Sequence, residues 1–507
     1  MPKVKNPKLQ NPIEKQFNKV TRYHYYFYFL IFSSKIPVFW HVLSLIFLAP
    51  PMDYHCNVTG IKHYVNSTKN VCPCDEVLWD RSVFTETMQT KFGLYCANNW
   101  LISFSQSIMY VGLLVGALVF GFLSDRYGRL SMFSLSCLIL AVSGCLVSAM
   151  PSAAAYTLMR NIEGIGTGGA IITSYVLCIE YTGVRHREIV TALFHIPLNI
   201  SHLTLPGISY LLRHCDEFQL ALSIPVFFYI GMRWMVMESP KWLMDSDRID
   251  ETVVVMEKFA SFTGTPRENI RTQIEEYHAH HSPKARRRLK IWHVFCHKKL
   301  GLNFFYMSMI YFLCGMGYYG VSQYIGKMSG NIHVNVAISG AMLLPGTIAS
   351  VFLIKLLNRR TFLISTVFLS GVFMITTICV PFHYNWLRVF IACICNCFFF
   401  ISFIIVFLFG VELFPTSIRN SVLGILSVIS RVGQITAPSI NALSENASGA
   451  VFGVLALIGT VFCFLLPETK DTELPSSLDD TKILSRGKIH LVEDVPMTQN
   501  IATSSTE

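Results

Sequence analysis

About twelve apolar runs divide this chain, and each is long enough to cross a membrane as a helix of about 20 residues. Only 14% of the 507 residues are charged, against roughly 25% in an ordinary globular protein. Because so few charges could not cover a soluble surface, we predict an all-α membrane protein with twelve transmembrane helices. The expected spans are Tyr26–Leu48, Leu101–Leu123, Leu130–Met150, Ala153–Tyr175, Ile189–Leu212, Leu220–Met237, Leu302–Tyr324, Val334–Leu357, Phe362–Pro381, Trp386–Gly410, Val422–Leu443 and Gly449–Leu466.

Lysine and arginine in short loops indicate orientation, because cytoplasmic loops carry an excess of both. Six of them precede the first span, from Lys3 to Arg22, so both termini are expected in the cytoplasm. The basic linker is expected to touch anionic membrane lipid. The predicted divisions are a cytoplasmic tail (1–23), an N-terminal six-helix bundle (24–243) with an extracellular loop (51–99), a cytoplasmic linker (244–299), a C-terminal six-helix bundle (300–470) and a cytoplasmic tail (471–507).

The extracellular loop carries two features of an oxidising, glycosylating compartment. Asn57 and Asn66 each begin an Asn-x-Thr sequon. Four cysteines can pair in three ways, and the sequence does not choose among them. Metal binding by a Cys-x-Cys pair is the weaker alternative, because the loop faces an oxidising medium. The disulfide candidates are Cys56, Cys72, Cys74 and Cys96.

Three sequence features recur in the two halves of the chain: a Glu/Arg pair, a glutamate after the last span of each half, and a loop between the second and third spans of each half. Because their separations are nearly equal, we predict two similar six-span halves. Such halves, related by an axis along the membrane normal, are typical of transporters that alternate access around a midplane site. An ATP-driven pump is excluded, because no loop is long enough for a nucleotide domain. The recurring pairs are Glu180 with Glu412, Arg187 with Arg419, Glu238 with Glu468, and Gly128 with Asn358, each 230 or 232 residues apart.

The loop GFLSDRYGRL, Gly121 to Leu130, suggests a gate. Asp125 is expected to cap a neighbouring helix N-terminus, where the dipole favours negative charge. Arg126 and Arg129 are expected to fix this loop on the inner face. Two charge pairs at the inner face would hold one conformational state and break in the other; the alternative is that they only anchor topology. These pairs are Glu180 with Arg187 and Glu412 with Arg419.

The loop GFLSDRYGRL resembles the signature of the major facilitator superfamily. Within it the chain resembles the organic cation, organic anion and carnitine transporter family, solute carrier family 22. That resemblance rests on VFTETMQTKFGLYC before the second span, ESPKWL after the sixth, YYG in the seventh, ELFPTSIRN after the tenth and PETKDTELP after the twelfth. Three departures are a short extracellular loop, Met237 in place of a proline and Lys355 in place of an aspartate.

Three ionisable residues near span centres are candidates for substrate binding, because a charge at the bilayer centre usually faces a cavity. They are Lys35, Glu163 and Arg431. Arg160, three residues before Glu163, can pair with it; the alternative for Lys35 and Glu163 is mutual neutralisation. The resemblance implies that a basic residue at position 431 marks the anion and carnitine branches. Thr347, where the anion branch often has lysine, argues the other way.

Aromatic and polar side chains complete the candidate site. The resemblance implies that Tyr318, Tyr319 and Phe403 face the cavity, where they could stack on an organic solute; ordinary helix packing is the alternative. His195 and Asn199 form a stripe with His202 along the fifth span. This stripe is interpreted as a polar cavity surface or as interhelical hydrogen bonding, with metal binding a minor alternative.

These residues predict a plasma-membrane carrier for a small organic anion or zwitterion. The alternatives are an organic cation carrier, a hexose facilitator, and a receptor that binds solute without moving it. The sequence carries no phosphate loop, nucleophile triad or metal-ligand spacing, so no enzyme, cofactor or metal is expected. Nucleic-acid binding is not expected, because the basic residues flank apolar runs. The coupling ion stays open.

Overall fold

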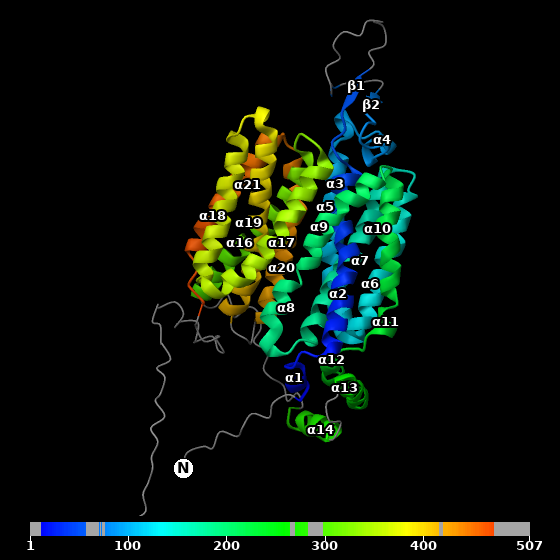
Figure 1. Ribbon diagram of the computed structural model, residues 1–507, viewed down its shortest axis with the longest axis vertical. Coiled ribbons are helices and arrows are strands. Elements are labelled where there is room, and N and C mark those ends of the chain that lie inside the picture. Colours follow the sequence, from blue (N-terminus) through cyan, green and yellow to red (C-terminus); the bar gives the residue numbers. More distant parts are fainter. Residues whose placement is uncertain are drawn as a thin grey trace, which may run out of the picture.

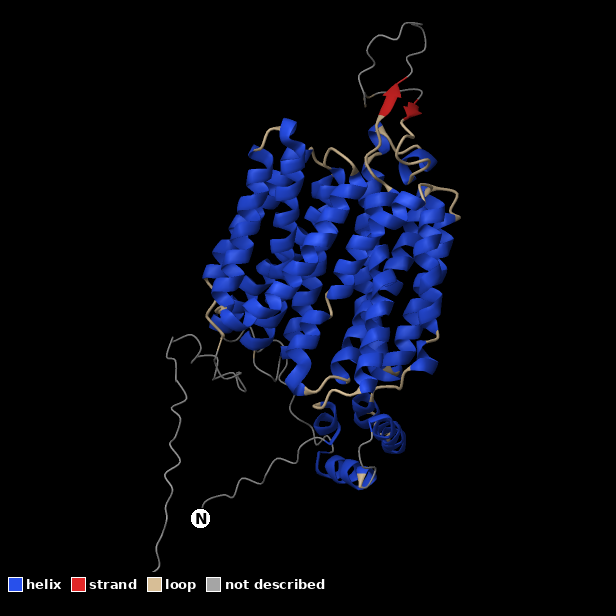
Figure 2. Ribbon diagram, viewed as in Figure 1, coloured by secondary structure: helices blue, strands red, loops and turns tan. Residues whose placement is uncertain are grey.

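Twelve helices long enough and apolar enough to cross a membrane dominate the computed structural model, as Figure 1 shows. The structure describes residues 12–56, 70, 72, 77–263, 269–281, 298–414 and 419–470. Within these ranges the prediction of an all-α membrane protein is confirmed, and the two short strands lie outside the helical bundles (Figure 2).

The spans form two bundles that stand side by side (Figure 1). The N-terminal bundle contains α2 (Arg22–Leu43), α5 (Trp100–Tyr127), α6 (Arg129–Ser148), α7 (Ala153–Glu180), α8 (Arg187–Leu193), α9 (Ile196–Leu211), α10 (Cys215–Ile230) and α11 (Met232–Met235). The C-terminal bundle contains α16 (Lys298–Lys327), α17 (Ile332–Leu356), α18 (Arg359–Cys379), α19 (Asn385–Leu413), α20 (Arg419–Asn441) and α21 (Glu445–Phe464).

Three expected spans are interrupted, and one of them, the sixth, is divided into α10 and α11 at Gly231. The first breaks at Ser44, after which α3 (Leu45–Leu48) continues as a separate short helix. The fifth is divided into α8 and α9 at Phe194 and His195. Pro197 is the second residue of α9, in the first turn, where a missing backbone N–H breaks no intrahelical hydrogen bond.

A small extramembranous unit marks one end of the N-terminal bundle, which we call the loop end. There β1 (Tyr54–Cys56) pairs antiparallel with β2 (Val77–Trp79), beside α4 (Met88–Phe92). Cys72 and Cys96 form a disulfide, and Cys56 is also disulfide-bonded. This confirms that cysteines of the loop pair. Cys74, Asn57 and Asn66 lie outside the described residues.

The opposite end of the N-terminal bundle, which we call the linker end, carries four short helices. One of them precedes the bundle in the sequence, and the other three follow it. They are α1 (Pro12–Phe17), α12 (Pro240–Asp245), α13 (Ile249–Thr263) and α14 (Ile270–His281), and all lie beyond the spans in Figure 1. The ring of Phe17 stacks on Tyr181 at 5.4 Å and meets Phe259 edge-on at 5.0 Å. These contacts hold α1 and α13 against the base of α7.

The two halves meet along α5 with α20 and along α9 with α17. Near the loop end the ring of His333, at the start of α17, stacks on Phe47 at 5.4 Å and meets Phe84 and Tyr210. Among the described residues, the hydrogen bonds between the halves occupy the part of the interface that extends from the loop end to Thr347. Between Thr347 and the linker end, the described residues form no hydrogen bond from one half to the other. The halves are thus joined on the loop-end side.

Candidate functional site

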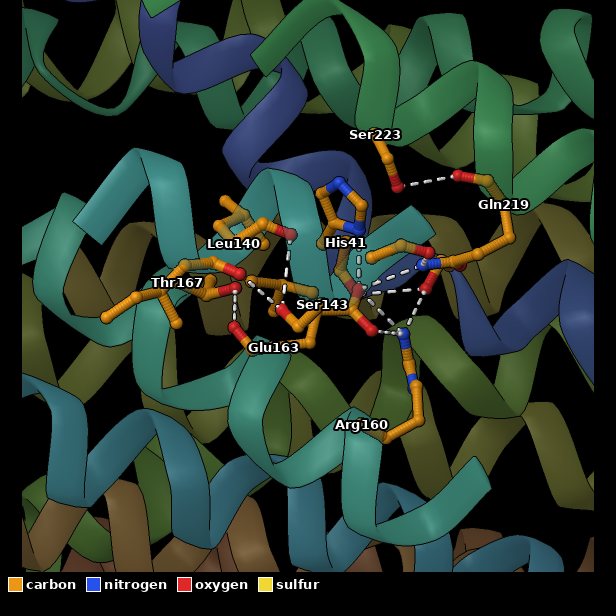
Figure 3. A network of polar contacts seen from close by, with 12 residues as sticks. His41, Leu140, Ser143, Arg160, Glu163, Thr167, Gln219 and Ser223 are labelled. Atoms are coloured by element: carbon orange, nitrogen blue, oxygen red, sulfur yellow. Dashed lines mark hydrogen bonds and ion pairs between the residues drawn. The ribbon is translucent and has the colours of Figure 1, made fainter. Parts of the chain in front are cut away.

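A buried polar network occupies the middle of the N-terminal bundle (Figure 3). One Glu163 oxygen lies 2.5 Å from His41 Nδ1 and 3.1 Å from a guanidinium nitrogen of Arg160. Gln219 Nε2 donates to the same oxygen at 3.2 Å. The side chains of His41, Arg160 and Glu163 have no exposed surface. The expected Arg160–Glu163 pair within α7 is therefore confirmed. The network around this pair joins α7 to α2 through His41 and to α10 through Gln219.

Lys35 is not the partner of Glu163 in this structure, so the alternative that the two neutralise each other is wrong. The carboxylate is already occupied by Arg160 and His41, and Lys35 lies instead over the ring of Phe194, with the ring of Phe39 at 5.3 Å. The residue is 1% exposed, and among the described residues Nζ has no hydrogen-bond partner. Lys35 is thus a buried basic residue with no carboxylate of the described chain beside it.

Arg431 of α20 is the basic candidate of the C-terminal half. Gly315 of α16 and Gly433 of α20 allow these helices to approach closely, because a methyl group at either position would overlap the partner's backbone. The approach places the guanidinium near enough to Tyr319 for an electrostatic interaction. Within the described part of the chain, Arg431 has neither an ion pair nor a hydrogen bond.

An aromatic cluster lies between the halves, beside Arg431. Tyr318 and Tyr319 meet at 4.8 Å, and Phe403 lies 6.2 Å and 6.4 Å from their rings. The half-buried ring of His195 approaches Phe403 edge-on at 6.2 Å, and Tyr110 of α5 approaches Tyr319 at 6.0 Å. The structure therefore gathers four predicted site residues from both halves into one cluster, and Lys35 lies near enough to His195 for an electrostatic interaction.

Asn199 and Thr347 contact each other across the halves. Asn199 Nδ2 donates to the Thr347 hydroxyl at 2.6 Å and to the Leu343 carbonyl at 3.3 Å. The Oδ1 atom of Asn199 and both ring nitrogens of His202 are buried without a partner. The stripe is interpreted either as a polar cavity surface or as interhelical hydrogen bonding. In this state Asn199 forms interhelical hydrogen bonds.

At the linker end, Arg129 joins the base of α6 to its neighbours. Arg129 pairs with Glu180 at 3.0 Å and also with Asp125. The Asp125 side chain is 69% exposed and lies at the end of α5; in this state its partner is Arg129, so the expectation that it caps a neighbouring helix stays a prediction. The N-terminus of α6 is capped by Glu238, whose oxygens accept from the backbone N–H groups of Arg129 and Leu130. Arg126 is exposed and lies against Tyr127.

The C-terminal half repeats this arrangement. Glu468 accepts from the backbone N–H groups of Arg359 and Arg360 at the start of α18. Arg359 pairs with Glu412 at 3.2 Å, as Arg129 pairs with Glu180. The offset of 230 or 232 residues found in the sequence therefore corresponds to equivalent contacts. Sequence reasoning noted Glu238 and Glu468 as marks of the repeat but gave them no role.

Glu238 is an acidic residue whose side chain lies at the N-terminus of α6. Burial raises the pKa of this carboxyl, while the N–H groups of Ser239, Leu130 and Arg129 act in the opposite direction. Gly128 has a φ of +103°, and a Cβ atom there would lie 2.7 Å from a Glu238 oxygen. A glycine is required at this turn by both its backbone conformation and its close neighbour.

In this state Arg187 does not pair with Glu180, so the expected gate pair stays a prediction for the other state. Arg187 instead pairs with Glu14 of α1 at 2.9 Å, and Lys241 reaches the same oxygen at 3.4 Å. Glu412 also accepts from the Thr469 hydroxyl at 2.7 Å. The side chain of Arg419 lies outside the described residues, so its pairing with Glu412 stays a prediction.

The fold and the duplicated linker-end contacts define a two-bundle membrane transporter. Residues 55–476 match the family described as "Sugar (and other) transporter", and the chain belongs to this family of the major facilitator superfamily. Curated relatives that resemble the chain include members of solute carrier family 22.

The relatives resemble most of the chain. The organic cation transporter protein of Drosophila melanogaster is 28% identical over 454 residues, which cover 85% of this chain and 82% of the relative. Solute carrier family 22 member 6 of Rattus norvegicus is 28% identical over 430 residues, covering 83% and 78%. The inward-open xylose transporter XylE from E. coli has a TM-score of 0.69 at 15% identity, covering 91% of this chain and 100% of that one. This last likeness concerns the fold.

Proposed function

We propose that the protein carries a small organic anion or zwitterion across the plasma membrane by alternating access. Within the spans, Glu163 is the only acidic residue away from the helix ends, and Arg160 and His41 already neutralise it. Lys35 and Arg431 therefore have no carboxylate of the described chain to offset them. This charge imbalance carries the proposal, because an uncompensated charge in a membrane interior is expensive.

The substrate contacts follow from this imbalance. A carboxylate or sulfate would bind Arg431 through two parallel hydrogen bonds, a geometry that suits a guanidinium. Tyr318, Tyr319, Phe403 and His195 would contact the apolar part of the solute, since aromatic faces stack on organic groups. We propose that Lys35 adds positive potential from the other half, and that Glu163 stabilises the bundle without touching the substrate.

An organic cation carrier is the second candidate, because one relative is an organic cation transporter. It would need an acidic residue in the site, and in the described residues the spans offer only the occupied Glu163. A third candidate is a receptor that binds solute without transporting it. Solute uptake into vesicles that contain the purified protein distinguishes this receptor from a carrier. A carrier accumulates labelled solute in the lumen, whereas a receptor binds label in proportion to protein and accumulates none.

The linker end is proposed to be the cytoplasmic gate. Asp125→Asn should slow transport several-fold while surface expression stays near the wild-type amount, because Asp125 is exposed and pairs only within its own half in this state. We propose that the carboxylate contacts the other half when this side closes, so that its charge matters in one state only. Uptake rates normalised to surface protein test this. A normal rate in Asp125→Asn would mean that the loop only fixes orientation.

Glycosylation tests the proposed orientation. If the loop end is extracellular, glycans should occupy Asn57 or Asn66, because both sequons lie in the loop that follows the first span. Glycosidase should increase the gel mobility of the wild-type protein and leave Asn57→Gln/Asn66→Gln unchanged. A wild-type chain that glycosidase does not shift, when expressed in a glycosylating host, would contradict this orientation.

A further inference from the structure

Four side chains that suit a transition metal meet at the loop end, away from the proposed substrate site. Glu86 precedes α4, and His214, Cys215 and Asp216 form the entry into α10. One ligand atom from each residue lies within 4.8 Å of the other three. Glu86 and His214 are 128 residues apart in the sequence, so no ligand spacing along the chain could indicate this cluster.

The backbone holds the two segments in register. Cys215 N donates to the Glu86 carbonyl at 3.1 Å, and Thr85 N donates to the Arg213 carbonyl at 3.2 Å. These bonds flank a parallel bridge between Glu86 and His214. The ligand positions therefore follow from paired main chain, and do not depend on the chance meeting of long surface side chains.

The side chains already point at one another. His214 Nε2 lies 2.8 Å from a Glu86 oxygen, and Cys215 Sγ lies 3.7 Å from an Asp216 oxygen. Cys215 is a buried free thiol, while the other three ligands are partly buried. Lys91 Nζ lies 2.7 Å from both Asp216 oxygens and 2.9 Å from the Ser148 carbonyl. One Asp216 oxygen can thus bind a metal while the other keeps Lys91 as an outer partner.

We propose that Glu86, His214, Cys215 and Asp216 bind one Zn²⁺ ion. One nitrogen, one sulfur and two oxygens form a four-ligand set that suits Zn²⁺, whereas Mg²⁺ and Ca²⁺ prefer oxygen alone. With four protein ligands the site is closed, as structural zinc sites are. The ion would join the segment before α4 to the top of α10.

Binding requires two proton movements. The Cys215 thiol loses its proton to solvent, because the thiolate is the metal ligand. His214 Nδ1 accepts from the Asp216 N–H at 3.4 Å, so the ring proton lies on Nε2, toward Glu86. To bind through Nε2, the ring moves this proton to Nδ1 and gives up the Asp216 N–H. The balance is one proton released for each Zn²⁺ bound.

Calorimetric titration of the detergent-purified full chain with ZnCl₂ tests the proposal without requiring transport. The protein should carry an affinity tag without histidine and have His278, His280 and His281 replaced by glutamine, which removes three closely spaced histidines at the end of α14. We expect one Zn²⁺ per chain, with one proton released as judged from buffers of different ionisation enthalpy. Cys215→Ser and His214→Gln should each weaken binding at least tenfold, and Cys145→Ser, a change at another free cysteine, should leave it unchanged.

Co²⁺ gives a second readout that does not depend on the stability of a variant. The protein with Cys215 should show a thiolate-to-cobalt charge-transfer absorption, and Cys215→Ser should lack it. Zn²⁺ should also raise the apparent melting temperature, since a ligand that binds only the folded state stabilises it. Absence of stoichiometric Zn²⁺ binding, or equal binding by wild type, Cys215→Ser and His214→Gln, would overturn the proposal.

Discussion

Arg431→Ala should lower the uptake of an organic anion by about tenfold or more, because a hydrogen bond to a charged group contributes about 1.5–3 kcal/mol. Arg431→Lys should also impair uptake, since an ammonium cannot copy the two-pronged contact of a guanidinium. Arg431→Asp should abolish anion uptake and admit organic cations. Uptake kinetics of one anion and one cation, normalised to surface protein, measure all three effects.

Arg233→Ala is the matched control, because it removes an exposed arginine of α11, in the N-terminal half and away from the aromatic cluster. Its uptake should equal that of the wild type. If Arg431→Ala transports the native substrate with unchanged affinity and rate, then Arg431 has a structural role and the anion proposal loses its main support.

Glu163→Gln should destabilise the protein strongly and leave substrate selectivity unchanged. The substitution leaves Arg160 buried without a counter-charge, and removal of one partner of a buried pair costs about 3–5 kcal/mol. The apparent melting temperature of detergent-purified protein measures the loss. The selectivity of the protein that does reach the surface should match the wild type.

The double variant Arg160→Met/Glu163→Met separates the two roles of Glu163. It removes both charges together, and replacement of a buried pair by apolar side chains of similar size is often nearly neutral. We expect it to recover most of the stability that Glu163→Gln loses. A Glu163→Gln protein with normal stability and altered substrate affinity would instead place Glu163 at the substrate.

The sequence predicts the architecture well because the membrane imposes it. Each apolar run must become a helix to satisfy its own backbone, so the spans could be located from hydropathy, with breaks such as that at Ser44 left unseen. The repeat was visible because Glu238 and Glu468 cap equivalent helices. Their role was missed because a cap depends on a helix end that is distant in the chain.

The buried partners were harder to predict from the sequence. Glu163 and Arg160 are one helical turn apart, so their pairing follows from local geometry. His41, from another helix, displaced Lys35 as the second partner, and the choice between two basic residues of one span depends on which face of α2 meets α7. The signal available was an ionisable histidine within an apolar run. The pairing of Arg187 with Glu14 was equally hard to predict, because Glu14 lies in a short helix that hydropathy does not reveal.

Uptake into vesicles reconstituted with the purified protein tests the central claim most directly. Radiolabelled organic anions, a zwitterion such as carnitine, organic cations and hexoses should be compared, with protein-free vesicles as the blank. We expect an anion or zwitterion to accumulate in the lumen and to exchange with unlabelled solute of its own class. Accumulation of organic cations or hexoses, with no uptake of anions or zwitterions, would contradict the account.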